Sequence, residues 1–292
     1  MSQHDAVVGV IGLGAMGRPM AEHLLRARGA LRITGRARRH GDLEALGATW
    51  AETPRALAEG ADVVVSMLPD LPQLEDALDG PDGLLAAERP LLLVIASTSS
   101  PTGVRALAER LASATDGRVR VVDAPVSGGV DGATAGTLSI MLGGEGPDSA
   151  EAAAVLEACG TPVHLGPLGA GQVAKAANQL VVGATMLAIA EATVLAERSG
   201  IDVDRLWTLL AGGYAGSNLL RSNHRRLVDE DYEPGGLARY MVKDLGFATD
   251  VADATSTHAT LLPTLREAYV ELVERGHGDA DLSVARRFVA ER

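Results

Sequence analysis

The sequence has almost no cysteine and few aromatic side chains. Its single cysteine, Cys159, has no partner for an internal disulfide bond. Phe, Trp and Tyr make up only 3% of 292 residues, so we expect a core built from aliphatic side chains. The N-terminal residues lack a basic region followed by a long apolar core and a cleavage site. Together these features predict a cytoplasmic protein in a reducing compartment.

Excess positive charge and long apolar runs are also missing. The 26 basic residues stand against 38 acidic ones, and the formal net charge of -12 gives no field that would attract nucleic acid or an anionic membrane. The apolar stretch 180–190 is too short to span a bilayer. With 47% apolar and 22% charged residues, the composition is that of a globular protein. We therefore expect a soluble protein with a small-molecule partner and neither nucleic-acid nor membrane partners.

Lysine is the rarest of the charged residues. All basic side chains are arginine except Lys175 and Lys243. Codon bias is one explanation. The other is that these two positions need an amine, which a guanidinium group does not replace because it stays charged.

Short apolar runs and helical patterns alternate over the first 165 residues, which predicts a doubly wound α/β sheet. From residue 169 onward the patterns are only helical, so we expect one domain over 1–165 and an all-helical domain over 166–292. A helix near 172–198 is apolar nearly all round, which indicates burial between domains or subunits and favours a dimer or tetramer. The expected strands are 6–11, 31–34, 62–66, 91–96, 119–122, 138–142 and 161–164. The expected helices include 15–28, 54–59, 101–113, 147–159, 172–198, 204–210, 237–254, 261–274 and 282–290.

Three glycines form the pattern G-x-G-x-x-G directly after the first expected strand. Gly12 allows a tight turn, Gly14 lets the backbone approach a pyrophosphate, and Gly17 lets the helix pack closely on the strand. The N-terminus of that helix offers free N–H groups to an anion. The motif predicts a dinucleotide site, and the alternative is a structural glycine-rich turn.

Three arginines follow the second expected strand. Enzymes that use NAD place a carboxylate there, but the first acid after this strand is Asp42, and Arg36, Arg38 and Arg39 occupy the region. Guanidinium groups pair bidentately with phosphate, so we expect NADP(H) to be favoured, with NAD(H) possible. The alternative is a solvated arginine cluster.

Two further segments carry residues suited to catalysis. Ser127, Gly128 and Gly129 offer a hydroxyl and unshielded N–H groups, which suit a small carboxylate. Lys175 and Asn178 are three residues apart and share one face of a predicted helix. Because small and apolar residues flank Lys175, we interpret it as a partly buried amine that exchanges protons rather than a solvated charge.

These segments, in this order and at this spacing, resemble the β-hydroxyacid dehydrogenase family over nearly the whole chain. The resemblance implies a Rossmann-type N-terminal domain and an all-helical C-terminal domain, with a cleft between them. It also implies hydride transfer between nicotinamide and a small β-hydroxy acid or semialdehyde carboxylate, of the 3-hydroxyisobutyrate or tartronate semialdehyde type.

The resemblance also implies roles for single residues. Lys175 would be the catalytic lysine and Asn178 its helper. Ser127, Gly128, Gly129 and Lys243 would bind the substrate. The implied cofactor contacts are Gly12, Leu13, Gly14, Ala15, Met16, Gly17, Arg36, Arg38, Arg39, Leu68, Pro69, Gln73, Thr98 and Lys243. The chain departs from the family at two positions where the family often has Asn. Gly35 stands at the end of the second expected strand, and His23 occupies the other position.

Two alternatives remain open. An imine reductase shares this scaffold but usually carries another residue in place of Lys175. A non-catalytic NADP-binding sensor or interaction protein would not need the complete set of site residues. No metal is expected, since the seven histidines lack the spacing of metal ligands.

Overall fold

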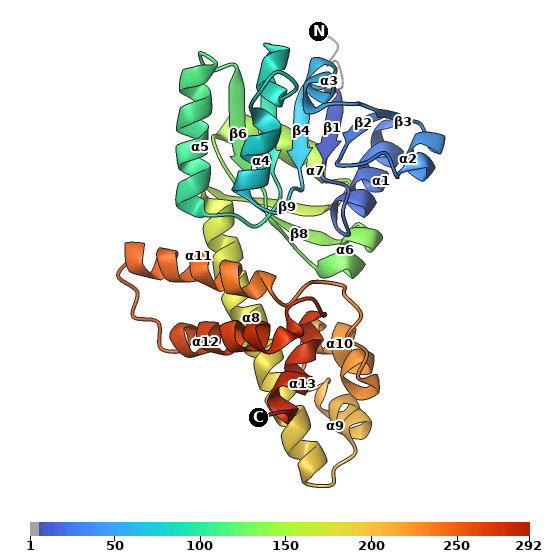
Figure 1. The fold of residues 1–292 in the computed structure, drawn as a ribbon, viewed down its shortest axis with the longest axis vertical. Helices are drawn as coiled ribbons and strands as arrows, with labels where there is room; N and C mark the ends of the chain where they lie inside the picture. Colours follow the sequence, from blue (N-terminus) through green and yellow to red (C-terminus); the bar gives the residue numbers. More distant parts are fainter. Residues whose placement is uncertain (1–5) are drawn as a thin grey trace. The chain divides into compact units, whose positions relative to one another are not determined.

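The computed structural model describes residues 6–292, which form two compact units (Figure 1). The first unit ends at Lys175 and contains a nine-stranded sheet with helices on both faces. The second begins at Ala176, and its elements are helices. A Rossmann-type sheet followed by a helical region is the predicted fold class, which is confirmed.

The sheet has the strand order β3-β2-β1-β4-β5-β6-β8-β7, with β9 beside β8. The strands from β3 to β6 are parallel, in the order typical of dinucleotide-binding folds, and β8 runs antiparallel to β6 and β7. The strands are β1 (Val8–Ile11), β2 (Leu31–Thr34), β3 (Ala48–Trp50), β4 (Val63–Ser66), β5 (Leu91–Ile95), β6 (Val119–Asp123), β7 (Val126–Ser127), β8 (Leu138–Gly143) and β9 (Gly160–Gly166).

Helices cover both faces of this sheet. Figure 1 shows α3, α4 and α5 in front of the sheet and α7 behind it. Because both faces are covered, central strands such as β5 are continuous apolar runs. Thr53 and Ser100 cap α3 and α5, and each is followed by a proline, which suits a first helical turn. The helices are α1 (Gly17–Arg28), α2 (Gly41–Ala45), α3 (Pro54–Glu59), α4 (Leu71–Leu78), α5 (Pro101–Ala114), α6 (Gly129–Ala135) and α7 (Gly146–Leu156).

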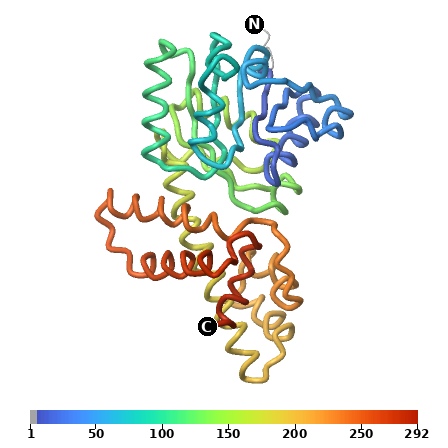
Figure 2. Tube along the Cα trace, viewed as in Figure 1, coloured from blue at the N-terminus to red at the C-terminus, as the bar shows by residue number. Residues whose placement is uncertain are grey.

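The second unit has its own core. The α11 and α12 helices lie side by side (Figure 2). Tyr269 is buried in this core and donates a hydrogen bond to the carbonyl of Gly183 at 3.0 Å. The buried Arg286 donates to the carbonyl of Leu227 at 2.7 Å and pairs with Glu197. The helices are α8 (Ala170–Arg198), which begins within the first unit, α9 (Val203–Leu210), α10 (Asn218–Asp229), α11 (Tyr240–Ala254), α12 (Leu262–Leu272) and α13 (Ala285–Ala290).

Six strands and α-helices of the described chain were not named among the expected elements, and three of them are the short helices α2, α4 and α6. The structure adds β3 and β7 to the seven expected strands, and both are too short to give a periodic signal. The α10 helix was also not expected, because only Leu220 and Leu227 are buried among its twelve mostly polar residues.

The α8 helix is long and apolar enough to cross a membrane by length and composition alone. The core helices of soluble proteins meet the same criteria of length and composition. In α8, 44% of the most apolar window is buried within the protein.

Candidate active site

The three motif glycines occupy different environments at the end of β1. Gly12 has a φ of +95°, and a Cβ there would lie 2.7 Å from the carbonyl carbon of Met67. At Gly17 a Cβ would lie 1.9 Å from the carbonyl oxygen of Gly12, so Gly12 and Gly17 shape the turn and the helix contact. A Cβ at Gly14 would meet no heavy atom within 4 Å. The first turn of α1 has neither a side-chain cap nor an acidic residue, so its N–H groups suit an anion such as a pyrophosphate.

The sheet topology brings several expected cofactor contacts to one edge. The chain continues from β1 to β2 on one side, whereas β4 lies on the other, so the strand order reverses between β1 and β4. Ligands of such sheets bind outside the carboxyl ends of the strands at this point. Leu68 and Pro69 follow β4, Thr98 follows β5, and the exposed Gln73 lies in the first turn of α4. These residues therefore lie beyond the carboxyl ends of β4 and β5, next to the point where the strand order reverses.

The three arginines after β2 are exposed but not equivalent. The Arg38 guanidinium donates to the carboxylates of Glu44, at 2.5 Å, and Glu52, at 3.2 Å. The hydrogen bond from Arg38 lowers the pKa of Glu44 below its ordinary value. Neither Arg36 nor Arg39 forms an ion pair with a residue between positions 6 and 292. The structure thus leaves two of the three guanidinium groups without a carboxylate partner in the described chain.

The first acid after β2 is also paired. Asp42 accepts hydrogen bonds from Arg18 of α1, and this contact lowers the pKa of Asp42. Arg18 bonds Glu22 as well, at 2.9 Å. The Asp42 carboxylate therefore has a partner within the protein.

The expected substrate turn lies between β7 and α6. Gly128 and Gly129 have φ values of +135° and +63°, a backbone conformation that favours glycine. Both are exposed, and Ser127 precedes them at the end of β7. His23 of α1 lies 2.9 Å from the carbonyl oxygen of Thr134 through Nε2, which fastens α6 to α1. The turn offers a hydroxyl and backbone N–H groups at an accessible position.

Lys175 lies in the second turn of α8 and is only 8% exposed, so the residue is buried. Its part in proton exchange stays a prediction. Asn178 follows one helical turn later. Its amide donates to Gln179 Oε1 at 2.9 Å, and Gln179 Nε2 donates to Asp244 Oδ2 at 2.6 Å. Gln179 thus connects Asn178 to a buried carboxylate on α11.

Lys243 is held in place on α11. Its Nζ atom donates to Asp244 Oδ1 at 2.8 Å and lies 5.9 and 5.2 Å from the ring centroids of Tyr240 and Phe247. Sequence reasoning assigned no role to Asp244 or Gln179. Their positions directly after Lys243 and Asn178 were the available signal.

Two further buried residues, Asp123 and Gln172, were not predicted from the sequence, and both bind near the start of α8. Asp123 ends β6 and accepts the N–H groups of Gly169 and Gln172, each at 2.7 Å. Burial raises the pKa of Asp123 to about 6, although these two hydrogen bonds act in the opposite direction. The Gln172 side chain accepts from Ser99 N and donates to the carbonyl of Ser97, both at 2.9 Å. Asp123 opens the segment DAPVSGG, but nothing in that segment indicates partners so distant in sequence.

Comparisons with known proteins cover both units. A family model described as the NAD binding domain of 6-phosphogluconate dehydrogenase matches residues 7–183. A second, described as "NAD-binding of NADP-dependent 3-hydroxyisobutyrate dehydrogenase", matches residues 169–289.

Individual relatives agree with these models. An NAD-dependent L-serine dehydrogenase from Pseudomonas aeruginosa is 36% identical over 96% of each chain. The 2-hydroxy-3-oxopropionate reductase of Escherichia coli is 34% identical over 94% of each chain. A structure of Mycobacterium tuberculosis 3-hydroxyisobutyrate dehydrogenase with L-serine has a TM-score of 0.80 and 33% identity, and covers 97% of this chain and 98% of its own. The chain is therefore an NAD(P)-binding oxidoreductase that belongs to the β-hydroxyacid dehydrogenase family.

Proposed function

We propose that the chain transfers a hydride between NADP(H) and a small β-hydroxy acid or its semialdehyde, with Lys175 as general acid and base. The observation that carries the proposal is the burial of Lys175 in α8, one helical turn before Asn178. The names of the relatives add L-serine, 3-hydroxyisobutyrate and 2-hydroxy-3-oxopropionate as small carboxylate candidates.

The nicotinamide would supply the hydride, and the side chains of this protein would place the substrate and move the proton. Ser127 Oγ and the N–H groups of Gly128 and Gly129 would bind the substrate carboxylate. Asn178 would donate a hydrogen bond to the carbonyl oxygen. During reduction, Lys175 Nζ would give that oxygen a proton as the carbonyl carbon accepts the hydride, and in oxidation the neutral amine would take the hydroxyl proton.

Lys175→Ala and Lys175→Arg test the proposed chemistry. We expect turnover to fall by about 100-fold or more, the usual contribution of general acid catalysis, while NADPH affinity stays nearly unchanged. Steady-state kinetics and NADPH fluorescence titration measure the two quantities. An alanine variant within about tenfold of the parent rate would exclude this role for Lys175.

The substrate class is tested by a panel assay at 340 nm. Tartronate semialdehyde, methylmalonate semialdehyde, succinic semialdehyde, glyoxylate and a cyclic imine would be assayed with NADPH and NADH. L-serine and 3-hydroxyisobutyrate would be assayed with the oxidised cofactors. Turnover of the imine alone would indicate an imine reductase, and tight NADPH binding without any turnover would indicate a sensor.

We also propose that NADP(H) is preferred, through Arg36 and Arg39. Both are exposed, and among residues 6–292 neither has an ion-pair partner, whereas Arg38 is paired with Glu44 and Glu52. Arg36→Ala should raise the KM for NADPH by about tenfold, the equivalent of one charged contact, and leave that for NADH nearly unchanged. Arg38→Ala serves as the matched control with a smaller expected effect. Equal loss with both cofactors would contradict the assignment.

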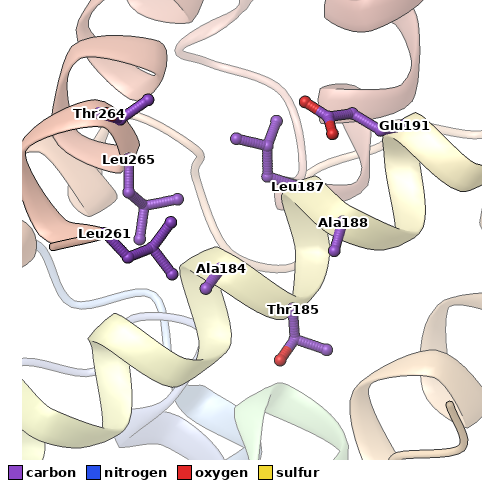
Figure 3. Close-up of a pocket in the computed structure, with 8 residues that line it drawn as sticks. All are labelled: Ala184, Thr185, Leu187, Ala188, Glu191, Leu261, Thr264 and Leu265. Atoms are coloured by element: carbon purple, nitrogen blue, oxygen red, sulfur yellow. The ribbon is translucent and has the colours of Figure 1, made fainter.

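We further propose a homo-oligomer, a dimer or tetramer, in the cytoplasm. The outer side of α8 supports it, because Val181 and Leu195 are 64% and 69% exposed. Beside α8 lies a largely apolar groove of about 540 Å³ (Figure 3). The residues that line it are Ala184, Thr185, Leu187, Ala188, Glu191, Leu261, Thr264 and Leu265.

A further inference from the structure

The first turn of α8 is fastened to the sheet by one buried carboxylate. Asp123 is 0% exposed, and its two oxygens accept the N–H groups of Gly169 and Gln172. Glycines make this approach possible, since a Cβ at Gly143 or Gly171 would lie 2.4 or 2.8 Å from those oxygens. The place where α8 begins is therefore set by Asp123 rather than by a residue of the helix itself.

Gln172 extends this attachment to the neighbouring strand. Its side-chain amide bonds to Ser97 and Ser99, the residues on either side of Thr98. Gln172 is 1% exposed, so these hydrogen bonds are shielded from water. Asp123 and Gln172 together join the loop after β5, the end of β6 and the first turn of α8. Lys175 lies in the next turn of the same helix.

The negative charge of Asp123 bears on the protonation of Lys175, because both lie near the start of α8. Lys175 follows Gln172 by three residues, about 4.5 Å along the helix axis. The N-terminus of a helix carries about half a positive charge, which disfavours the charged form of a lysine nearby. Arg105 of α5 is a further positive charge, and its attraction lowers the pKa of Asp123. The flanking strands β5 and β8 carry no charged residue. Above pH 6 or so, Asp123 is ionised and offsets this positive charge.

We propose that Asp123 is a positioning residue for Lys175: it fixes the first turn of α8, and its charge keeps the Lys175 ammonium group protonated. Gln172 aligns that turn with the Thr98 loop. The inference extends the proposed function, because it concerns the proton that Lys175 would transfer.

The scarcity of lysine permits a direct test without a substrate. In protein labelled with [¹³Cε]-lysine, Lys175 and Lys243 give the two side-chain signals, and Lys175→Met assigns them. In Asp123→Asn, we expect the titration midpoint of the Lys175 signal to move to lower pH by about one unit, since one nearby charge is lost. The Lys243 signal is the internal control and should not move. A Lys175 midpoint within about 0.2 units of the parent would overturn the proposed charge effect.

Hydrogen exchange tests the positioning role in the same protein. Asp123→Asn should speed amide exchange at Gly169 and Gln172, because one acceptor oxygen is replaced by an amide NH₂ group. Asp148→Asn is the matched control, since it removes a carboxylate that pairs with Arg120 elsewhere in the first unit. Unchanged exchange at the start of α8 would contradict the fastening role.

A second variant covers the case in which Asp123→Asn does not fold. Gln172→Leu keeps the carboxylate, so the Lys175 signal should titrate as in the parent while kcat falls about tenfold or more. A parental kcat would overturn the positioning role. If Lys175→Ala instead keeps full turnover, the proposed function fails, whereas the titration shift in Asp123→Asn is measured independently of catalysis.

Discussion

A methyl group at Gly17 would lie 1.9 Å from the carbonyl oxygen of Gly12, whereas one at Gly14 would meet no heavy atom within 4 Å. Gly17 therefore lies where α1 contacts the end of β1. Gly14 borders an open space beside the start of α1, which has no side-chain cap. Substitution at single residues therefore separates folding from cofactor binding.

Alanine variants at these two glycines should behave in opposite ways. Gly17→Ala should lower the free energy of unfolding by about 1–3 kcal/mol or prevent folding, because backbone must move. Gly14→Ala should keep parental stability and weaken NADPH binding by about tenfold, because its methyl group would occupy the pyrophosphate site. Chemical denaturation and fluorescence titration measure both. Parental NADPH affinity in Gly14→Ala would argue against this place for the pyrophosphate.

Residues differ in how far their surroundings can be predicted from sequence. The burial of Lys175 was predictable because its neighbours are small and apolar and lysine is otherwise absent from surface positions. The partners of Asp123 are backbone N–H groups 46 and 49 residues further along the chain. Backbone groups leave no mark in the sequence, so this contact was visible only in the fold.

Strands also differ in whether the local sequence predicts them. The strands β1, β4 and β5 were predictable, because burial on both faces requires unbroken apolar runs. The three residues of β3 take their conformation from pairing with β2. The antiparallel direction of β8 likewise depends on its partner strands, which local sequence does not specify.

The outer side of α8 yields a prediction at the element scale. Val181→Glu and Leu195→Glu should shift the protein toward monomers, because a buried unpaired carboxylate opposes association. Sedimentation velocity measures the assembly state. Leu46→Glu, at a 53% exposed leucine of the first unit, is the matched control and should leave assembly unchanged. A monomeric parent protein would contradict the proposed oligomer.

At the scale of the whole molecule, Asp123 makes stability depend on pH. Burial raises its pKa to about 6, so between pH 4 and 6 the folded chain binds a proton that the unfolded chain does not. The contribution of Asp123 to the free energy of unfolding should therefore increase as the pH falls through this range, by up to about 3 kcal/mol.

Urea denaturation of the parent and Asp123→Asn at pH 7.5 and 4.5 isolates this contribution. Exposed pairs such as Arg18–Asp42 lower carboxyl pKa values and act in the opposite direction, but they are present in both proteins and cancel. The stability difference between the two proteins should shift in favour of the parent at pH 4.5. An identical response to pH in both would contradict a raised pKa for Asp123.

The contacts of the three motif glycines also determine which of them could be replaced in relatives that no longer bind a nucleotide. A descendant that abandoned redox chemistry would still need Gly12 and Gly17, because its first helix could not otherwise rest on its first strand. Only Gly14 would be released from selection. In a degenerate relative, survival of the outer two glycines would be inherited architecture, and the middle glycine would be the position that reports whether a nucleotide is still bound.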